Sequence, residues 1–176
     1  MWQYLTGMRI GEVLALQVKK VFQETGKWFV KINCTLEYSK KRKSEFMISS
    51  TPKTQSSNRT ILLPDKAVMI YQQYCLDKQP DDLLFSVKTK TGVFLHPFSI
   101  DNQLRRVQKS LDLAKPLSTH IFRHTHASKL AELGLPTELI SKRLGHKDST
   151  ITRQIYLHVT KKTAARYSGL INSFDV

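Results

Sequence analysis

Alternation of apolar and polar residues predicts a small β-sheet in the first third of the chain. Residues 27–37 alternate in the manner of a half-buried strand. The apolar face of that strand would consist of Trp28, Val30, Ile32, Cys34 and Leu36. Two more apolar runs, residues 46–50 and 59–64, are separated by a turn rich in Pro, Ser, Thr and Asn. The three segments together predict a three-stranded antiparallel sheet.

Apolar residues at helical spacing predict that most of the remaining chain is helical. A first helix would begin near Thr6 or Met8, and further helices would cover residues 65–78, 99–114, 118–133, 136–144 and 148–156. Ser118 is expected to cap the start of its helix, while Gly134 and Gly145 each follow the end of one. The pattern indicates one α+β domain, mainly helical with a small three-stranded antiparallel sheet, and 176 residues suit a single domain.

The net charge of the chain indicates the kind of molecule that it binds. The chain has 28 Lys and Arg against 14 Asp and Glu, a formal net charge of +14. A positive field of that size is typical of a protein that binds a polyanion, most simply nucleic acid. A charge that serves solubility alone is the less favoured explanation, because the excess of basic residues is clustered. One cluster comprises Lys40, Lys41, Arg42 and Lys43. We expect it to follow a DNA backbone, although a solvated loop would have the same composition.

Other features set the compartment. Cys34 and Cys75 form neither a disulfide framework nor a metal-binding spacing, and are interpreted as thiols of a reducing compartment. The first residues lack the basic region of a signal peptide, and no apolar run approaches the length of a membrane span. We therefore expect a cytoplasmic protein with no membrane partner.

The histidines and arginines of the predicted 118–133 helix offer a first candidate site. His120 and Arg123 share a face, with Ala127 and Ala131 beneath them, although a surface pair would look the same. A zinc site built from the histidines of this helix is set aside, because no thiolate or Glu completes it at metal spacing. Neither a metal nor a cofactor is expected.

A wider set of polar residues could attack a phosphodiester without metal, the cations stabilising the transition state. Arginines supply forks for phosphate, histidines and lysine can move protons, and a tyrosine can be the nucleophile. The set is Arg9, Lys53, His120, Arg123, His146 and Tyr156. Spacing alone does not select these residues from the chain.

A family resemblance does select them. The segments "TGMRIGEVLAL", "TPKTQSSNRTILLP", "STHIFRHTHASKLAELGLP" and "ISKRLGHKDSTITRQIYLHVT" resemble, in order, the four signature regions of the tyrosine recombinases. The similarity is to integrases of phages and conjugative elements, and covers nearly the whole chain as their C-terminal catalytic domain. It implies that family's catalytic-domain fold, and metal-independent cleavage and rejoining of DNA through a 3′-phosphotyrosine.

The resemblance also implies roles for single residues. Tyr156 would be the nucleophile, Arg9 and Arg123 would hold the nonbridging oxygens of the scissile phosphate, and His146 would hydrogen-bond the same phosphate. His120 would take the tyrosine proton or orient the phosphate, and Lys53 would protonate the leaving 5′-oxygen.

The neighbours of these residues receive supporting roles. Glu12, one turn after Arg9, is interpreted as support for that arginine. Lys142, Arg143 and Lys147 flank His146 and are candidate contacts to the DNA backbone. None suggests a base-specific contact, so the target sequence is not predicted.

The resemblance also implies an assembly. Residues 1–176 would be the catalytic domain of a longer chain whose N-terminal DNA-binding domain is absent, so this fragment should bind DNA weakly and be mainly monomeric. The full-length protein would act on double-stranded DNA as a homotetramer, with DNA-bending accessory proteins as further partners. The segment after residue 160 could dock on a neighbouring subunit or on its own domain.

Two alternatives stay open. A type IB topoisomerase-like nicking and closing enzyme would use a similar set of Tyr, Arg, His and Lys, and strand exchange between two sites would separate the two. A basic DNA-binding module with structural Tyr, His and Arg residues is the non-enzymatic alternative.

Overall fold

The structure is a computed structural model that describes residues 1–38, 45–50, 58–87, 94–114, 116–146, 150, 152–157 and 159. Its elements, in chain order, are α1 (Trp2–Thr6), α2 (Ile10–Leu14), a 3-10 turn η1 (Val18–Lys20), β1 (Val21–Glu24), β2 (Lys27–Ile32), β3 (Thr35–Glu37), β4 (Met47–Ser49), β5 (Arg59–Leu62), α3 (Asp65–Cys75), α4 (Pro97–Ser110), α5 (Thr119–Glu132) and α6 (Thr137–Leu144). Residues 152–157 are also helical. The predicted class, mainly helical with small antiparallel sheets, is confirmed.

The pairing of the strands differs from the prediction. The three-stranded sheet has the order β1-β2-β5, and β2 is antiparallel to both neighbours, so that Val30 lies opposite Val21 and Ile61. The predicted strand over residues 27–37 divides after Ile32, and β3 pairs with β4 in a separate two-stranded sheet. The prediction of one sheet from residues 27–37, 46–50 and 59–64 was therefore wrong in its pairing.

β1 escaped the prediction because its sequence carries little alternation. Among its four residues Val21 alone is buried. The turn that joins it to β2 contains Thr25 at φ 49° and Gly26 at φ 76°. Two successive positive φ values are what a type I′ hairpin turn requires, and such turns match the twist of the strands they connect.

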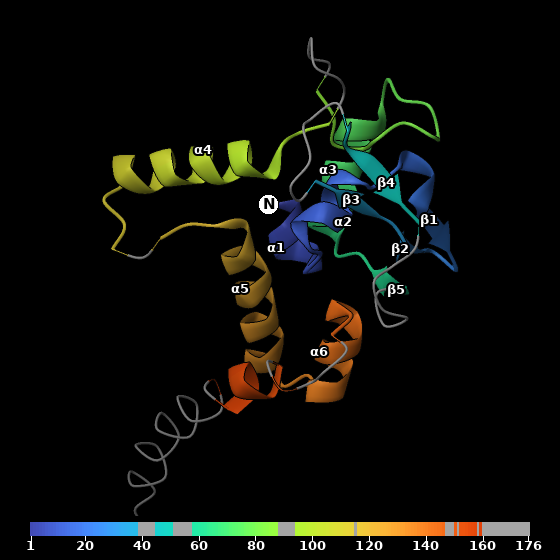
Figure 1. Cartoon of the computed structure of the whole chain (residues 1–176). Coiled ribbons are helices and arrows are strands. Elements are labelled where there is room, and N and C mark those ends of the chain that lie inside the picture. The colour runs from blue at the N-terminus through green and yellow to red at the C-terminus, as the bar shows by residue number, and fades with distance from the viewer. Residues whose placement is uncertain are drawn as a thin grey trace, which may run out of the picture.

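Among the described residues, two of three apolar clusters mark a sheet lobe and a helical lobe. In the sheet lobe, Val30 and Ile61 pack with Ala67 of α3 and with residues of α1 and α2. In the helical lobe, Ala127 of α5 packs with Ile140 and Leu144 of α6. α1 contacts both α3 and α5 and so joins the lobes (Figure 1). The candidate site lies where the lobes meet.

The helices follow the prediction with one difference at the N-terminus. α3, α4, α5 and α6 begin within two residues of their predicted starts, and Gly145 follows α6 as expected. Ser118 occupies the N-cap position of α5, but its side chain makes no capping hydrogen bond. The predicted first helix, however, is two helices. Gly7 ends α1 with a φ of 69°, and α2 begins only at Ile10.

α4 extends away from both lobes (Figure 1). Ile100, in its first half, packs partly against a third apolar cluster that contains Leu14 and Phe46. Phe98 and Val107 are exposed. Within the described residues, no helix is both long and apolar enough to cross a bilayer.

Candidate active site

Arg9 is positioned by the break between the first two helices. The left-handed Gly7 turns the chain, and Arg9 then takes the extended conformation of an N-cap residue, with φ −69° and ψ 151°. Glu12, in the first turn of α2, accepts a hydrogen bond from the backbone N–H of Arg9 at 2.8 Å. Its other oxygen accepts one from Nη1 of Arg9 at 3.0 Å. The expected pairing of Glu12 with Arg9 is present.

Arg59, at the start of β5, shares the same carboxylate. Its Nη1 and Nη2 donate to Oε1 and Oε2 of Glu12 at 2.9 and 2.8 Å, a two-bond fork. Both side chains are 5% exposed. Burial alone would raise the pKa of Glu12, but the hydrogen bonds and charges of Arg59 and Arg9 outweigh it, and the net pKa is lowered. Glu12 is therefore a buried anion between two cations.

The C-terminus of α6 gathers three arginines. The carbonyl of Arg143 accepts from Nε of Arg59 at 2.7 Å, that of Leu144 from Nη2 of Arg123 at 2.7 Å, and that of Gly145 from Nη2 of Arg9 at 2.8 Å. The last carbonyls of a helix have no intrahelical partner and lie at the negative end of its dipole. Three consecutive carbonyls thus hold guanidinium groups from β5, α5 and the start of α2.

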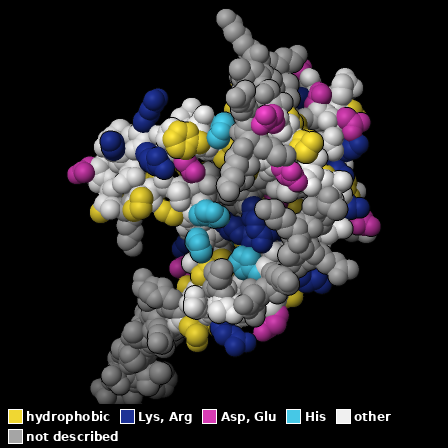
Figure 2. Space-filling model, viewed as in Figure 1, with side chains coloured by type: hydrophobic (Ala, Val, Ile, Leu, Met, Phe, Trp, Pro, Cys, Tyr) yellow, Lys and Arg dark blue, Asp and Glu magenta, His cyan; other side chains and the backbone are white. Residues whose placement is uncertain are grey.

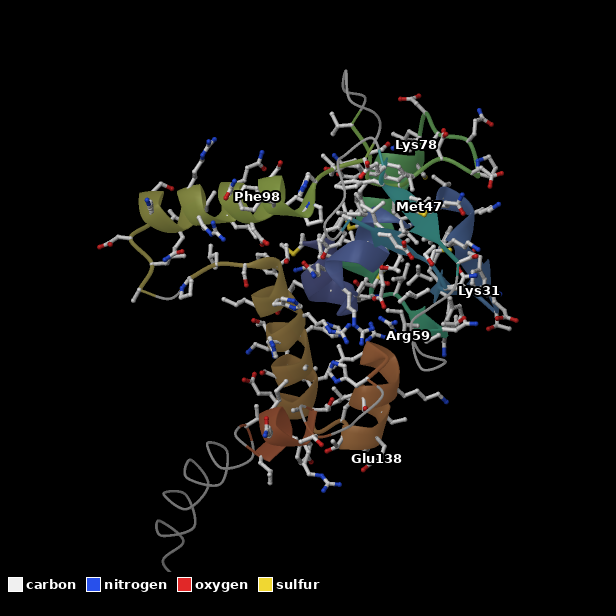
Figure 3. All side chains as sticks on the ribbon, viewed as in Figure 1. Lys31, Met47, Arg59, Lys78, Phe98 and Glu138 are labelled. Atoms are coloured by element: carbon white, nitrogen blue, oxygen red, sulfur yellow. The ribbon has the colours of Figure 1, made fainter. Side chains whose placement is uncertain are left out.

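Arg123 is the most buried of the predicted catalytic residues that the structure describes. It is 6% exposed, and its Nη1 also donates to the carbonyl of Gly7 at 2.5 Å. Burial, followed by the positive charge of Arg9, lowers the pKa of Arg123 to about 9, so it is still a cation at neutral pH. In Figure 3 the labelled Arg59 lies between the sheet lobe and the end of α6, among the nitrogen-rich side chains of this region.

His146 follows the left-handed Gly145 and borders the same site. Its Nδ1 lies 2.8 Å from Oγ1 of the buried Thr152. Burial, then the charges of Arg123 and Arg9, lower the pKa of His146 to about 4. The imidazole is therefore neutral at pH 7. A cleft of about 500 Å³ between β5 and α6 has Arg59, Gly145 and His146 in its wall.

The other predicted residues are placed differently. His120 lies exposed on the first turn of α5, three residues before Arg123. Tyr156 is half-buried and packs against the apolar cluster of α5 and α6. The helical segment 152–157 that contains it lies beside the C-terminal end of α5 (Figure 1). Outside the described residues lie Lys40, Lys41, Arg42, Lys43, Lys53 and Lys147.

Arg143 has a different environment from a surface phosphate contact. Its Nη1 donates to the carbonyl of Leu62 at 3.0 Å and its Nε to Nε2 of His126 at 3.1 Å. Nδ1 of His126 lies 2.7 Å from the carbonyl of Tyr4, so this imidazole carries its proton on Nδ1. Burial and Arg143 lower the pKa of His126 to about 4. The pair connects α1, α5, α6 and β5. Lys142, its neighbour, is exposed.

Sequence reasoning missed Arg59 and His126 as parts of this site. For Arg59 a signal was present, because the alternation along β5 places Arg59 and Ile61 on the buried side. A charged residue on a buried strand face requires a partner.

Within the described residues, no group of three or more His, Cys, Asp or Glu residues could hold a metal ion.

Basic and histidine side chains also meet on the surface around this site. In Figure 2, Lys, Arg and His side chains gather near the middle of the molecule, between α4, α5 and the sheet lobe. Arg9 and the buried Arg59 and Arg123 lie around the carboxylate of Glu12. Among the described residues, this centre therefore has an excess of positive charge.

Comparison with known proteins gives this site a family. A model of the phage integrase family matches residues 1–163. The integrase of Staphylococcus phage L54a is 36% identical over 168 residues, covering 91% of this chain and 47% of the phage protein. A probable integrase of prophage ps2 from Lactococcus lactis is 33% identical, covering 96% and 46%. The chain spans about half the length of the curated relatives it matches.

Solved structures agree at the level of the fold. The Tn1549 transposon integrase, in complex with circular intermediate DNA, superposes with a TM-score of 0.74 at 20% identity, covering 94% of this chain and 57% of that one. The XerH site-specific recombinase bound to its palindromic difH substrate gives 0.63 at 22% identity, covering 97% and 44%. By its sequence, this chain belongs to the phage integrase family.

Proposed function

We propose that this chain is the catalytic region of a site-specific DNA recombinase that cleaves and rejoins DNA strands through a 3′-phosphotyrosine. The observation that carries the proposal is the set of arginines on the last carbonyls of α6, with neutral His146 beside them. Family membership and the DNA complexes of the structural neighbours support the same function.

The proposed chemistry is a reversible exchange of phosphodiester bonds. The hydroxyl oxygen of Tyr156 attacks the phosphorus and loses its proton to His120, while the bond from phosphorus to the 5′-oxygen breaks. Lys53 donates the proton that the leaving 5′-oxygen requires. Attack by a 5′-hydroxyl on the phosphotyrosine reverses these transfers and rejoins the strand, so no external energy source is consumed.

The two arginines and His146 would stabilise the phosphate during both steps. Arg9, whose side chain is 38% exposed, would bind a nonbridging oxygen directly, and Arg123 beneath it would supply a second positive charge. If the hydroxyl of Thr152 donates to Nδ1 of His146, the neutral imidazole carries its proton on Nε2. That N–H is then a donor for the other nonbridging oxygen.

Double-stranded DNA is the proposed partner, and its backbone would contact Lys142 together with Lys40, Lys41, Arg42, Lys43 and Lys147. The longer protein would assemble as a homotetramer on two sites, with DNA-bending accessory proteins, in the cytoplasm at the nucleoid. Under this proposal residues 1–176 act as a monomeric catalytic domain when alone.

Covalent capture of DNA tests the proposal. A pool of duplexes with randomised sequence on both sides of one fixed nick would be incubated with the chain, without metal. The short strand released on cleavage diffuses away, so a covalent adduct accumulates. We expect an adduct with the wild-type chain and none with Tyr156→Phe.

The controls separate the alternatives. An adduct that persists in Tyr156→Phe would contradict the assigned nucleophile. Absence of any adduct, with DNA binding retained, would favour the DNA-binding module over an enzyme. Exchange of strands between two captured sites, and not relaxation of supercoils alone, would identify a recombinase.

A further inference from the structure

Arg59 belongs to the arginine site and borders the cleft beside α6, but its guanidinium group is bonded to protein acceptors. Its side chain is 5% exposed. Its Nε donates to the carbonyl of Arg143, and its Nη1 and Nη2 donate to the two oxygens of Glu12. All three nitrogens of the guanidinium group are therefore engaged with protein acceptors, whereas the side chain of Arg9 is 38% exposed.

Through these bonds Arg59 completes the coordination of Glu12. Oε1 accepts from Nη1 of Arg9 and Nη1 of Arg59, and Oε2 accepts from the backbone N–H of Arg9 and Nη2 of Arg59. A carboxylate offers about four lone-pair directions, and here all of them are used. Without Arg59, two of the four bonds are lost, and the carboxylate keeps only its two bonds to Arg9.

The third bond of Arg59 acts on the opposite side of the same site. The carbonyl of Arg143 that it holds is followed by the carbonyls of Leu144 and Gly145, which bind Arg123 and Arg9. Arg9 is thus held between Glu12 and the end of α6, and Arg59 contacts both.

We infer that Arg59 is a positioning residue of the phosphate site, fixing Glu12 and the last turn of α6 so that Arg9 is held ready for a scissile phosphodiester. This inference rests on the proposed function and adds a residue to it. Arg59 itself neither contacts the phosphate nor moves a proton. Its contribution is to the orientation of the Arg9 charge.

A DNA substrate with an uncharged scissile group distinguishes loss of Arg9 orientation from a general loss of protein stability. A duplex sequence recovered from the covalent adducts would be synthesised with either a normal phosphate or a methylphosphonate at the scissile position. The methylphosphonate lacks the negative charge that Arg9 would neutralise. For Arg59→Met we expect adduct formation on phosphate DNA to slow by about 10- to 100-fold, the range typical of removing a partner that orients a metal ligand. On methylphosphonate DNA the loss should be about threefold or less, as it should be for Arg9→Ala.

Matched variants make the comparison decisive. Val30→Ala removes side-chain volume from a fully buried position of the sheet lobe and should slow both substrates by the same factor. Arg59→Lys keeps the charge but loses the fork, and should lie between wild type and Arg59→Met on phosphate DNA. Equal losses on both substrates for a folded Arg59→Met chain would overturn the inference.

A second measurement keeps the inference testable if the proposed function fails. The Nε–H signals of arginine, recorded by ¹⁵N NMR without DNA, report whether the Arg9 guanidinium is held, and Arg9→Lys assigns its signal. We expect the Arg9 signal to broaden or vanish in Arg59→Met and to persist in Val30→Ala. Persistence of the Arg9 signal in Arg59→Met would overturn the positioning role, whatever the chain does to DNA.

Discussion

At the scale of single residues, the site is short of negative charge. Glu12 is the anion that Arg9 and Arg59 share, and Arg123 and His146 both have lowered pKa values to which the charge of Arg9 contributes. A positive charge that lowers the pKa of a neighbouring basic group opposes a second positive charge there, and a bound anion relieves that repulsion. The site therefore has an electrostatic preference for an anion such as a phosphodiester.

Buried His126 predicts how stability depends on pH. Its pKa is about 4 in the fold against about 6.5 when unfolded. Between these values the unfolded chain binds more protons, so the free energy of unfolding falls as pH is lowered from about 6.5 to 4. The contribution of His126 to that fall is roughly 3 kcal/mol, measurable by urea denaturation across this range.

A variant without a titrating group serves as the control for this prediction. His126→Gln can keep one of the two hydrogen bonds, and its stability should vary less with pH between 4 and 6.5 than that of the wild-type chain. His146→Gln tests the contribution of the other histidine whose pKa is lowered. Identical pH profiles for His126→Gln and wild type would show that His126 titrates normally in the fold.

The sequence could supply some of these residues and not others. Arg9, Glu12, Arg123 and His146 were predicted from signature segments, and the structure brings them together at the end of α6. Arg59 could not be paired with Glu12 in advance, because the two lie far apart in the chain and meet only when β5 packs beside α2 and α6. Pairing of buried charges depends on tertiary contacts that local patterns do not carry.

At the scale of elements, the site is built from helix ends. Gly7 ends α1, Arg9 starts α2, and the last carbonyls of α6 hold the arginines. The starts of α3, α4, α5 and α6 were the better predicted part, because caps mark them locally, whereas the break at Gly7 between α1 and α2 was missed. Strand pairing was the weaker part, since the break of the 27–37 strand into β2 and β3 is decided by which partners the two halves meet.

Gly7 tests how closely the end of α1 must approach α5 and α6. It has a φ of 69°, and an added Cβ would lie 2.5 Å from Cδ2 of His126 and 2.8 Å from Cδ2 of Leu144. We expect Gly7→Ala to destabilise the chain by about 2–4 kcal/mol, combining backbone strain with overpacking. Adduct formation should also slow, because the carbonyl of Gly7 binds Arg123.

Gly26→Ala is the matched control. Gly26 has a similar φ of 76°, but no atom lies within 4 Å of an added Cβ. It should therefore cost only the backbone strain, about 1–2 kcal/mol, and leave adduct formation unchanged. If the two variants unfold at the same denaturant concentration, the close approach at Gly7 has no energetic consequence.

At the scale of the whole molecule, the two lobes meet at the arginine site, which is positively charged. The sheet lobe contributes Arg9 and Arg59, the helical lobe contributes Arg123, and the whole chain has a formal net charge of +14. A charge excess on this scale acts at long range, whereas the buried arginines act at contact. Non-specific affinity for DNA and cleavage should therefore depend on different residues.

Salt dependence separates these two contributions. Lys142 is exposed, lines the cleft beside Gly145 and His146, and is placed to meet a DNA backbone. Each phosphate contact contributes about 0.9 to the slope of log affinity against log salt concentration. We therefore expect Lys142→Ala to weaken binding of random-sequence duplex and to reduce that slope by about 1, measured by fluorescence anisotropy at several salt concentrations.

Lys19→Ala removes the same charge from a lysine already paired with Asp81, and should leave the slope unchanged. Equal slopes for Lys142→Ala and Lys19→Ala would mean that DNA does not pass along the α6 side of the cleft, and that the net charge acts without a defined path.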